Sequence, residues 1–172
     1  MESQATASTA SPAQTRAIGA AIAPLLGAGD VILLVGPLGA GKTTLAQGLV
    51  AALGGREPVT SPTFTLAHRY RTSPPVTHVD LWRLGHLQEV VDLALEEELD
   101  GGGVVIVEWG EAAEPLYGDD ALVVRLGWGR TDDERTIVIE ARGASWTSRA
   151  AGLGEAAGAG AGTPGEATVG EG

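Results

Sequence analysis

Apolar residues recur along the chain with two alternating periods. Runs of consecutive apolar residues, rich in β-branched side chains, are typical of strands buried on both faces of a parallel sheet, and they occur at residues 31–35 and 104–107. Helical spacing, with apolar side chains on one face, occurs at residues 15–26, 43–53 and 87–99. Weaker strand patterns lie at residues 64–70, 76–81, 122–126 and 136–140. This alternation predicts an α/β fold, with a mixed sheet that is mostly parallel at its centre and helices on both faces.

The two ends of the chain differ from the middle in composition. Residues 1–12 are small and polar, and residues 143–172 are mostly Gly, Ala, Thr, Ser and Glu. Segments with so few large apolar side chains cannot offset the entropy that is lost on ordering. We therefore expect a disordered N-terminus over residues 1–12, one compact domain over residues 13–142 and a disordered Gly/Ala-rich tail over residues 143–172.

The net charge of the chain bears on which ligands it can bind. The 22 acidic residues outnumber the 11 basic ones and give a formal charge of −11, which argues against a protein that wraps a polyanion with a basic surface. The chain has no cysteine, so it has no disulfide, thiol nucleophile or cysteine-based metal cluster. The N-terminus lacks the features of a signal peptide, and no apolar run approaches the length of a membrane span. We expect a soluble, cytoplasmic protein with no membrane association.

The sequence GPLGAGKT at residues 36–43 fits the phosphate-loop pattern G-x-x-x-x-G-K-[ST]. It follows a predicted buried strand and precedes a predicted helix, which is the context that the motif requires. Glycines let successive backbone N–H groups turn toward a phosphate, and the helix N-terminus favours the same anion. Lys42, the only lysine of the chain, is expected to reach the β- and γ-phosphates, and the Thr43 hydroxyl to bind Mg²⁺. The motif predicts a P-loop NTPase-like sheet.

P-loop proteins usually place a carboxylate at the end of a second buried strand. Glu108 directly follows the apolar run at residues 104–107. It would lie near the phosphate loop, because parallel strands end at the same edge of a sheet. Asp80 ends a weaker strand pattern and is the alternative for binding the metal or orienting water. His78 shares a strand face with Asp80, although an isolated histidine is more often structural than catalytic.

Four motifs follow one another along the chain: GPLGAGKTTLAQGLVAALG, SPTF, HVDLWRL and VEWGE. Their combination resembles the bacterial TsaE family, and the resemblance runs from about Thr15 to Glu140. It implies a small P-loop ATPase that hydrolyses ATP with Mg²⁺ in the tRNA threonylcarbamoyladenosine (t6A) modification pathway. Family members act with the proteins TsaB and TsaD, so the resemblance implies that tRNA is reached indirectly, through that complex.

The resemblance also implies roles for residues of the phosphate loop and the two strand ends. The phosphates of the nucleotide would be held by Gly39, Ala40, Gly41, Lys42, Thr43 and Thr44. Thr43 and Glu108 would bind Mg²⁺. Asp80 would belong with Lys42 and Glu108 to the catalytic set, close to the metal.

Residues outside the loop and the strand ends also acquire roles from the resemblance. Thr15 would line the adenine pocket, and Trp109 would lie near the nucleotide. The family's switch-like loop is matched by Ser61, Pro62 and Thr63. One departure is Trp82, which stands where the family's H-x-D-x-Y-R-L motif has tyrosine and therefore lacks its hydroxyl.

Two other functions are compatible with a nucleotide site. A small-molecule kinase would transfer the γ-phosphate to a hydroxyl and usually needs an arginine-bearing lid, whereas the segment EAAEPLYGDDAL that follows Glu108 is short and acidic. A nucleotide-switched scaffold would change partners with little hydrolysis. The sequence leaves open whether Asp80 or Glu108 positions the attacking water.

Overall fold

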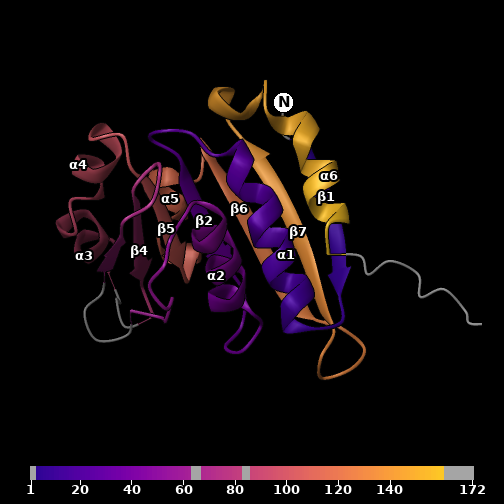
Figure 1. The fold of residues 1–172 in the computed structure, drawn as a ribbon. Coiled ribbons are helices and arrows are strands. Elements are labelled where there is room, and N and C mark those ends of the chain that lie inside the picture. The colour runs from indigo at the N-terminus through magenta and orange to yellow at the C-terminus, as the bar shows by residue number, and fades with distance from the viewer. Residues whose placement is uncertain (1–2, 63–66, 83–85, 161–172) are drawn as a thin grey trace, which may run out of the picture.

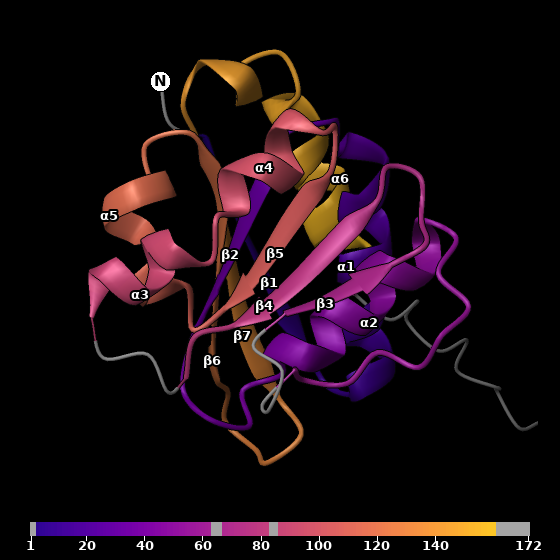
Figure 2. The same ribbon diagram turned by 90° about the vertical axis from the view of Figure 1, so that its left-hand side faces the viewer.

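The computed structural model describes residues 3–62, 67–82 and 86–160, and these form one seven-stranded sheet with helices on both faces (Figures 1 and 2). The strands are β1 (Ser3–Thr9), β2 (Val31–Val35), β3 (Ala67–Tyr70), β4 (Val76–Asp80), β5 (Val104–Glu108), β6 (Ala121–Trp128) and β7 (Arg135–Arg142). The α-helices are α1 (Pro12–Ile22), α2 (Lys42–Ala52), α3 (Leu87–Asp92), α4 (Leu95–Asp100), α5 (Glu114–Tyr117) and α6 (Leu153–Gly158). Short 3₁₀ segments are η1 (Ala23–Leu25), η2 (Gly110–Ala112), η3 (Ala144–Trp146) and η4 (Ala150–Gly152).

The sheet has the strand order β1-β7-β6-β2-β5-β4-β3. Strand β2 pairs in parallel with β6 and β5, and β5 pairs in parallel with β4. The outer strands β7, β1 and β3 are antiparallel to their neighbours. Every residue of β2 and β5 is buried, as their continuous apolar runs predict. The predicted mixed α/β sheet with a parallel centre is confirmed.

Two apolar cores lie on opposite faces of the sheet. Helices α1, α2 and α6 cover one face (Figure 1), and their core includes Ile32, Leu34 and Ile106. Helices α3 and α4 and the segment that leads into α5 cover the other face, where Leu33 and Val105 are buried. Alternate residues of the same strands therefore serve different layers. None of the helices in the described part of the chain is both long and apolar enough to cross a membrane.

The N-terminus is a strand, so the disorder predicted for residues 1–12 is wrong for residues 3–12. Strand β1 pairs with β7 along its whole length, and Ala7 and Thr9 are buried beneath the neighbouring helices. Ser11 then caps α1 by accepting a hydrogen bond from the backbone N–H of Gln14 at 3.2 Å. Composition did not reveal the strand because an open edge of β7 offers backbone hydrogen bonds, which do not depend on large side chains.

The predicted C-terminal disorder is likewise wrong for residues 143–160. Segments η3, η4 and α6 fold back so that α6 contacts α1 and β1. Trp146 and Leu153 are almost fully buried, and an Arg149 Nη2–H donates to Asp30 Oδ1 at 3.0 Å. The buried apolar surface of this segment comes from a few large side chains. The average composition of a Gly/Ala-rich segment does not show their effect. Residues 161–172, the remainder of the predicted tail, lie outside the described residues.

The single helix predicted over residues 87–99 is two short helices. Between α3 and α4, Ala94 adopts a left-handed backbone conformation with a φ of 52°. A residue with a Cβ seldom adopts that conformation. The helical spacing of apolar residues continues across the break, so the sequence pattern does not predict it. The helix predicted over residues 15–26 also starts earlier, at Pro12, and finishes as η1.

Helices α1 and α2 touch at two glycines. A Cβ added at Gly19 would lie 2.1 Å from the Leu45 carbonyl oxygen, and one added at Gly48 would lie 1.9 Å from the Arg16 carbonyl oxygen. Only glycine permits so close a backbone approach in a packed interior. Because α2 starts at the end of the phosphate loop, this contact fixes the loop and its helix against α1.

We expect Gly48→Ala to lower the free energy of unfolding by about 3 kcal/mol, because the added methyl group must push α1 away from α2. Gly154→Ala in α6 is the matched control, since nothing lies within 4 Å of a Cβ added there. The control should be neutral or stabilising by up to about 1 kcal/mol, because alanine has the higher helix propensity. Urea unfolding followed by tryptophan fluorescence measures both effects. Equal stabilities for Gly48→Ala and the parent would contradict the proposed backbone contact.

Candidate active site

The predicted loop and both candidate carboxylates meet at one edge of the sheet. Strands β2, β5 and β4 are parallel neighbours, so their carboxyl ends lie side by side. A cavity of about 320 Å³ opens at this edge. It is lined by Leu38, Gly39, Gly41, Lys42, Thr43, Thr44, Ser61, Asp80, Trp82, Glu108 and Trp109. Residues from all four sequence motifs therefore share one hollow.

The phosphate loop joins β2 to α2 in a conformation that needs glycine. Gly39 and Gly41 have φ values of 77° and 104°, in the region that other residues rarely adopt. Helix α2 begins at Lys42, directly after Gly41, so the unpaired N–H groups of its first turn lie at the loop. Ala40 does not line the cavity, because its methyl group is buried in the core and its N–H donates to the Pro37 carbonyl at 3.1 Å.

Lys42 is buried at the base of the loop. Its Nζ donates to the carbonyl oxygens of Gly36 at 2.6 Å and Pro37 at 2.8 Å, and it lies 4.0 Å from the centroid of the Trp109 ring. Burial lowers the pKa of the Lys42 ammonium below its ordinary value, and the negative charges nearby offset this only in part. The ammonium is thus held by uncharged groups close to the cavity wall.

Glu108 ends β5 with both carboxylate oxygens engaged. The Thr43 hydroxyl donates to Oε1 at 2.7 Å, and His78 Nε2 lies 2.6 Å from Oε2. Burial acts to raise the pKa of Glu108, but the hydrogen bond and charge of His78, the Thr43 hydroxyl and the Lys42 ammonium outweigh it, so the pKa lies below its ordinary value. The carboxylate is therefore ionised near neutral pH and aligned with the Thr43 hydroxyl.

Asp80 ends β4 directly opposite Glu108 in the parallel pairing. Its Oδ2 accepts a hydrogen bond from the Ser61 hydroxyl at 2.5 Å, and its Oδ1 accepts one from the Trp82 N–H at 2.8 Å. The first position of the predicted switch-like loop thus contacts the second carboxylate. Pro62 is buried, and Thr63, the third position, lies outside the described residues.

The donor set fits a hard divalent cation such as Mg²⁺. Two carboxylates and one hydroxyl offer the oxygen ligands that Mg²⁺ prefers, and Mg²⁺ commonly takes its other ligands from phosphates and water. Among the described residues, no group of three or more His, Asp or Glu could hold a metal ion without such help. The arrangement therefore suits a cation that arrives with a phosphate group, not a metal held entirely by the protein.

Trp109 follows Glu108 in a left-handed conformation with a φ of 58°. Such a conformation is unfavourable for a bulky residue and is stable only where the surroundings enforce it. The ring packs against Trp82, with 4.4 Å between centroids, while Trp82 itself is 52% exposed. The turn therefore places the Trp109 ring against Lys42 and in the wall of the cavity; its position near a nucleotide stays a prediction.

Thr15 lies outside this cavity, in a smaller adjoining hollow of about 80 Å³. The hollow is lined by Ser11, Pro12, Thr15, Gly39, Gly41, Thr44, Asp133 and Arg135. The Thr15 hydroxyl is 2.8 Å from that of Thr9, so it is already partnered by β1. The two hollows share Gly39, Gly41 and Thr44, so they meet at the phosphate loop and the first turn of α2.

The family described as "Threonylcarbamoyl adenosine biosynthesis protein TsaE" matches residues 9–137. The chain belongs to the TsaE family. The protein named "tRNA threonylcarbamoyladenosine biosynthesis protein TsaE" of Streptomyces coelicolor is 43% identical over 140 residues, which cover 77% of this chain and 94% of that one. The Bacillus subtilis protein of the same name is 39% identical over 139 residues, covering 78% and 84%.

The fold agrees with that of a solved structure as well. The crystal structure of Bacillus subtilis YdiB has a TM-score of 0.76 and 32% identity to this chain, with coverage of 90% of this chain and 97% of YdiB. The resemblance to TsaE inferred from the four motifs is thus confirmed. The TsaE match ends at residue 137, so the C-terminal segments η3, η4 and α6 lie beyond it.

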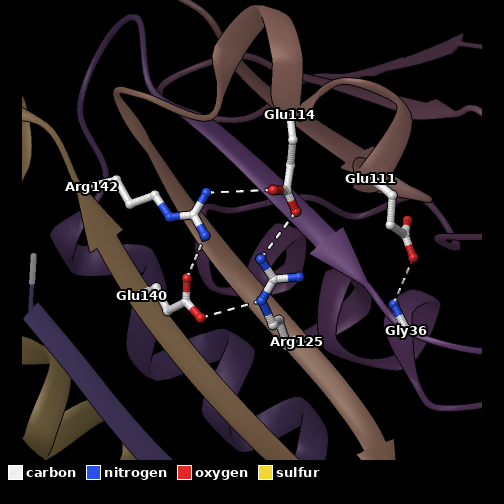
Figure 3. A network of polar contacts seen from close by, with 6 residues as sticks. All are labelled: Gly36, Glu111, Glu114, Arg125, Glu140 and Arg142. Atoms are coloured by element: carbon white, nitrogen blue, oxygen red, sulfur yellow. Dashed lines mark hydrogen bonds and ion pairs between the residues drawn. The ribbon is translucent and has the colours of Figure 1, made fainter.

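A ring of four charged residues holds α5, which follows the VEWGE motif (Figure 3). Arg125 of β6 contacts Glu114 of α5 at 3.1 Å and Glu140 of β7 at 3.2 Å. Arg142 of β7 closes the ring, at 3.5 Å from Glu114 and 2.6 Å from Glu140. Glu111, the last residue of that motif, accepts a 3.4 Å hydrogen bond through Oε1 from the N–H of Gly36 in the phosphate loop. The turn that carries Trp109 is thereby tied to both the sheet and the loop.

Sequence reasoning missed Glu111 and gave His78 little weight. The signals for His78 were its place in the HVDLWRL motif and its two-residue spacing from Asp80, which places both side chains on one face of β4. Its contact with Glu108 depends on the pairing of β4 with β5, which the sequence does not encode locally. Glu111 ends the VEWGE motif, but its contact could not be predicted, because its partner is a backbone N–H 75 residues away.

We expect Glu114→Gln to lower the free energy of unfolding by about 1 kcal/mol or less, because it removes two partly exposed ion pairs from the ring. Glu155→Gln is the control, since Glu155 forms no ion pair within the described residues. Urea unfolding at low salt and at high salt measures the difference, which should shrink as salt screens the ring. A loss as large in the control would show that the ring adds nothing.

Proposed function

We propose that this chain binds ATP with Mg²⁺ in the cavity and hydrolyses it to ADP and phosphate, as the ATPase component of tRNA threonylcarbamoyladenosine modification. The observation that carries the proposal is the convergence of Lys42, Thr43, Asp80 and Glu108 on one hollow beside a glycine-dependent loop. A cationic group, a hydroxyl and two carboxylates are the parts that phosphoryl transfer requires. Family membership supports the pathway.

The loop would bind the phosphates through backbone N–H groups and Lys42. The first turn of α2 supplies N–H groups that have no partner within the helix. Among the described residues, the Lys42 ammonium donates hydrogen bonds only to carbonyl oxygens, and a phosphate oxygen is a stronger acceptor for an ammonium. Binding would therefore exchange two neutral partners for a charged one, and the ammonium would stabilise charge that builds up on the phosphates during transfer.

The two carboxylates would have different tasks. Glu108 is bonded to the Thr43 hydroxyl, so these two would hold Mg²⁺ together, and the metal would supply further charge stabilisation on the phosphates. Asp80 is bonded instead to Ser61 in the loop after α2. We assign to Asp80 the orientation of the attacking water, because its carboxylate lines the same cavity without contacting Thr43.

The pathway follows from the relatives, which are named as tRNA threonylcarbamoyladenosine biosynthesis proteins. In this pathway the chain would act with TsaB and TsaD in the cytoplasm. A net charge of −11 works against direct tRNA binding. Contact with tRNA would therefore be made through the partner proteins, with this chain supplying ATP turnover.

The segment after Glu108 argues against the small-molecule kinase. A kinase lid must open and close over the phosphates, whereas α5 is tied to β6 and β7 by the ring of Figure 3. Both arginines of the ring are engaged by carboxylates on that side of the sheet. The nucleotide-switched scaffold differs from our proposal only in its rate of turnover, so kinetic measurement separates the two.

Lys42→Ala should reduce ATP turnover by about 100-fold or more while the protein remains folded, because the charge stabilisation at the phosphates is lost. Arg56→Ala is a suitable control, because it also removes one positive charge but lies outside both hollows. Phosphate release measures turnover, and circular dichroism checks the fold. Normal turnover by folded Lys42→Ala would refute the assignment of the cavity as an ATPase site.

ATP turnover should change when TsaB and TsaD are added together, since the proposed role is to serve that pair. The experiment compares phosphate release by the chain alone and with the pair, and it measures binding of the pair with and without ATP. Lys42→Ala in the same mixture gives the background. If both turnover and binding were indifferent to TsaB and TsaD, the pathway assignment would fail even with the ATPase intact.

A further inference from the structure

His78 is a polar side chain buried inside the sheet. It lies on β4 with no exposed surface, opposite Ile106 of β5. Its Nε2 is 2.6 Å from Glu108 Oε2, while its Nδ1 is buried and has no hydrogen-bond partner among the described residues. Leaving a buried nitrogen unpaired is unfavourable, so packing alone does not account for an imidazole here. Glu108 is the one group with which this ring forms a hydrogen bond in the described part of the chain.

The two carboxylate oxygens of Glu108 contact residues of two different elements. Thr43 of α2 contacts Oε1, and His78 of β4 contacts Oε2. The terminal torsion of a glutamate is broad and weakly restrained by itself. The Nε2–H tautomer of His78 restrains it by donating to Oε2, which leaves Oε1 directed to the Thr43 hydroxyl.

We propose that His78 is a positioning residue, which fixes the carboxylate of Glu108 so that Oε1 and the Thr43 hydroxyl are presented together to Mg²⁺. The inference rests on the proposed function, since it concerns the metal-binding step of that site. The His78 side chain does not line the cavity itself. Its effect on the metal would pass entirely through the orientation of Glu108, as for other groups that hydrogen-bond to a metal ligand.

Two substitutions separate this role from simple packing. In glutamine the amide nitrogen is three bonds from Cβ, as is Nε2 of histidine, so His78→Gln can still donate to Glu108. In asparagine the nitrogen is one bond closer to Cβ, so His78→Asn carries the same amide but cannot reach. Unfolding by urea should show similar stabilities for the two variants. If His78→Asn does not fold, His78→Leu replaces it as the variant that cannot donate.

The test measures the affinity for ATP by calorimetry, first in EDTA and then over a series of Mg²⁺ concentrations. For His78→Asn, the Mg²⁺ concentration at half-maximal effect should rise by about 10- to 100-fold. The affinity in EDTA should equal that of the parent, because Lys42 and the loop are untouched. His78→Gln should behave like the parent in both conditions. Turnover of His78→Asn should recover at high Mg²⁺.

Three outcomes would overturn the inference. His78→Asn could match the parent in its Mg²⁺ dependence, His78→Gln could fail to restore it, or His78→Asn could lose affinity equally in EDTA. Each of these would leave the proposed ATPase site standing if the parent itself responds to Mg²⁺. A parent whose affinity and turnover ignore Mg²⁺ would instead overturn the proposed metal site, and this inference with it.

Discussion

The parallel alignment of β2, β5 and β4 is the constraint on which the site depends. Each strand contributes one functional element at its carboxyl end: the phosphate loop, Glu108 and Asp80. The pairing places Asp80 directly opposite Glu108, and a shift of one residue would move either side chain to the other face of the sheet. Because Leu33 and Val105 pack in one core and Ile32, Leu34 and Ile106 in the other, such a shift would also exchange side chains between two closely packed cores. The burial that stabilises the sheet therefore also fixes the geometry of the site.

Helix packing on one face of the sheet also fixes the position of the phosphate loop. Helix α6 contacts α1 and β1, and α1 meets α2 backbone to backbone at Gly19 and Gly48. Helix α2 starts at Lys42, so a displacement of α1 would move the residues that face the cavity. The C-terminal segment lies beyond the TsaE match, yet it extends the same layer and adds support behind the loop. It belongs to the domain structurally.

The sequence was a good guide wherever a local pattern determines the structure. The apolar runs predict β2 and β5, and the eight residues of the loop motif predict a strand–loop–helix unit that the structure contains. The failures have a common physical cause, which is dependence on a distant partner. Strand β1 forms because β7 has an open edge, and residues 143–160 are ordered by a few anchors such as Trp146. The break at Ala94 likewise has no signal in the apolar period.

The same distinction applies to the candidate site. Lys42, Thr43 and Glu108 could be predicted because each occupies a fixed position in a motif or at the end of an apolar run. The contact of His78 with Glu108 could not, because it requires the pairing of two strands 28 residues apart along the chain. Thr15 was predicted beside the nucleotide and lies in the adjoining hollow. Its role stays a prediction, since its hydroxyl is already bonded to Thr9.

The partners of the charged groups explain how the site can be stable and still favour binding of an anion. Burying an ionised group is costly unless it is paired and hydrogen-bonded, and Glu108 meets that condition through Thr43 and His78. Lys42 is satisfied less fully, because its hydrogen bonds go to two neutral carbonyls and burial lowers its pKa. The carboxylates are thus held firmly, while the ammonium gains most from an incoming anion. A negatively charged ligand with its cation would complete both partnerships at once, which is the electrostatic reason for our proposal that the site takes ATP with Mg²⁺.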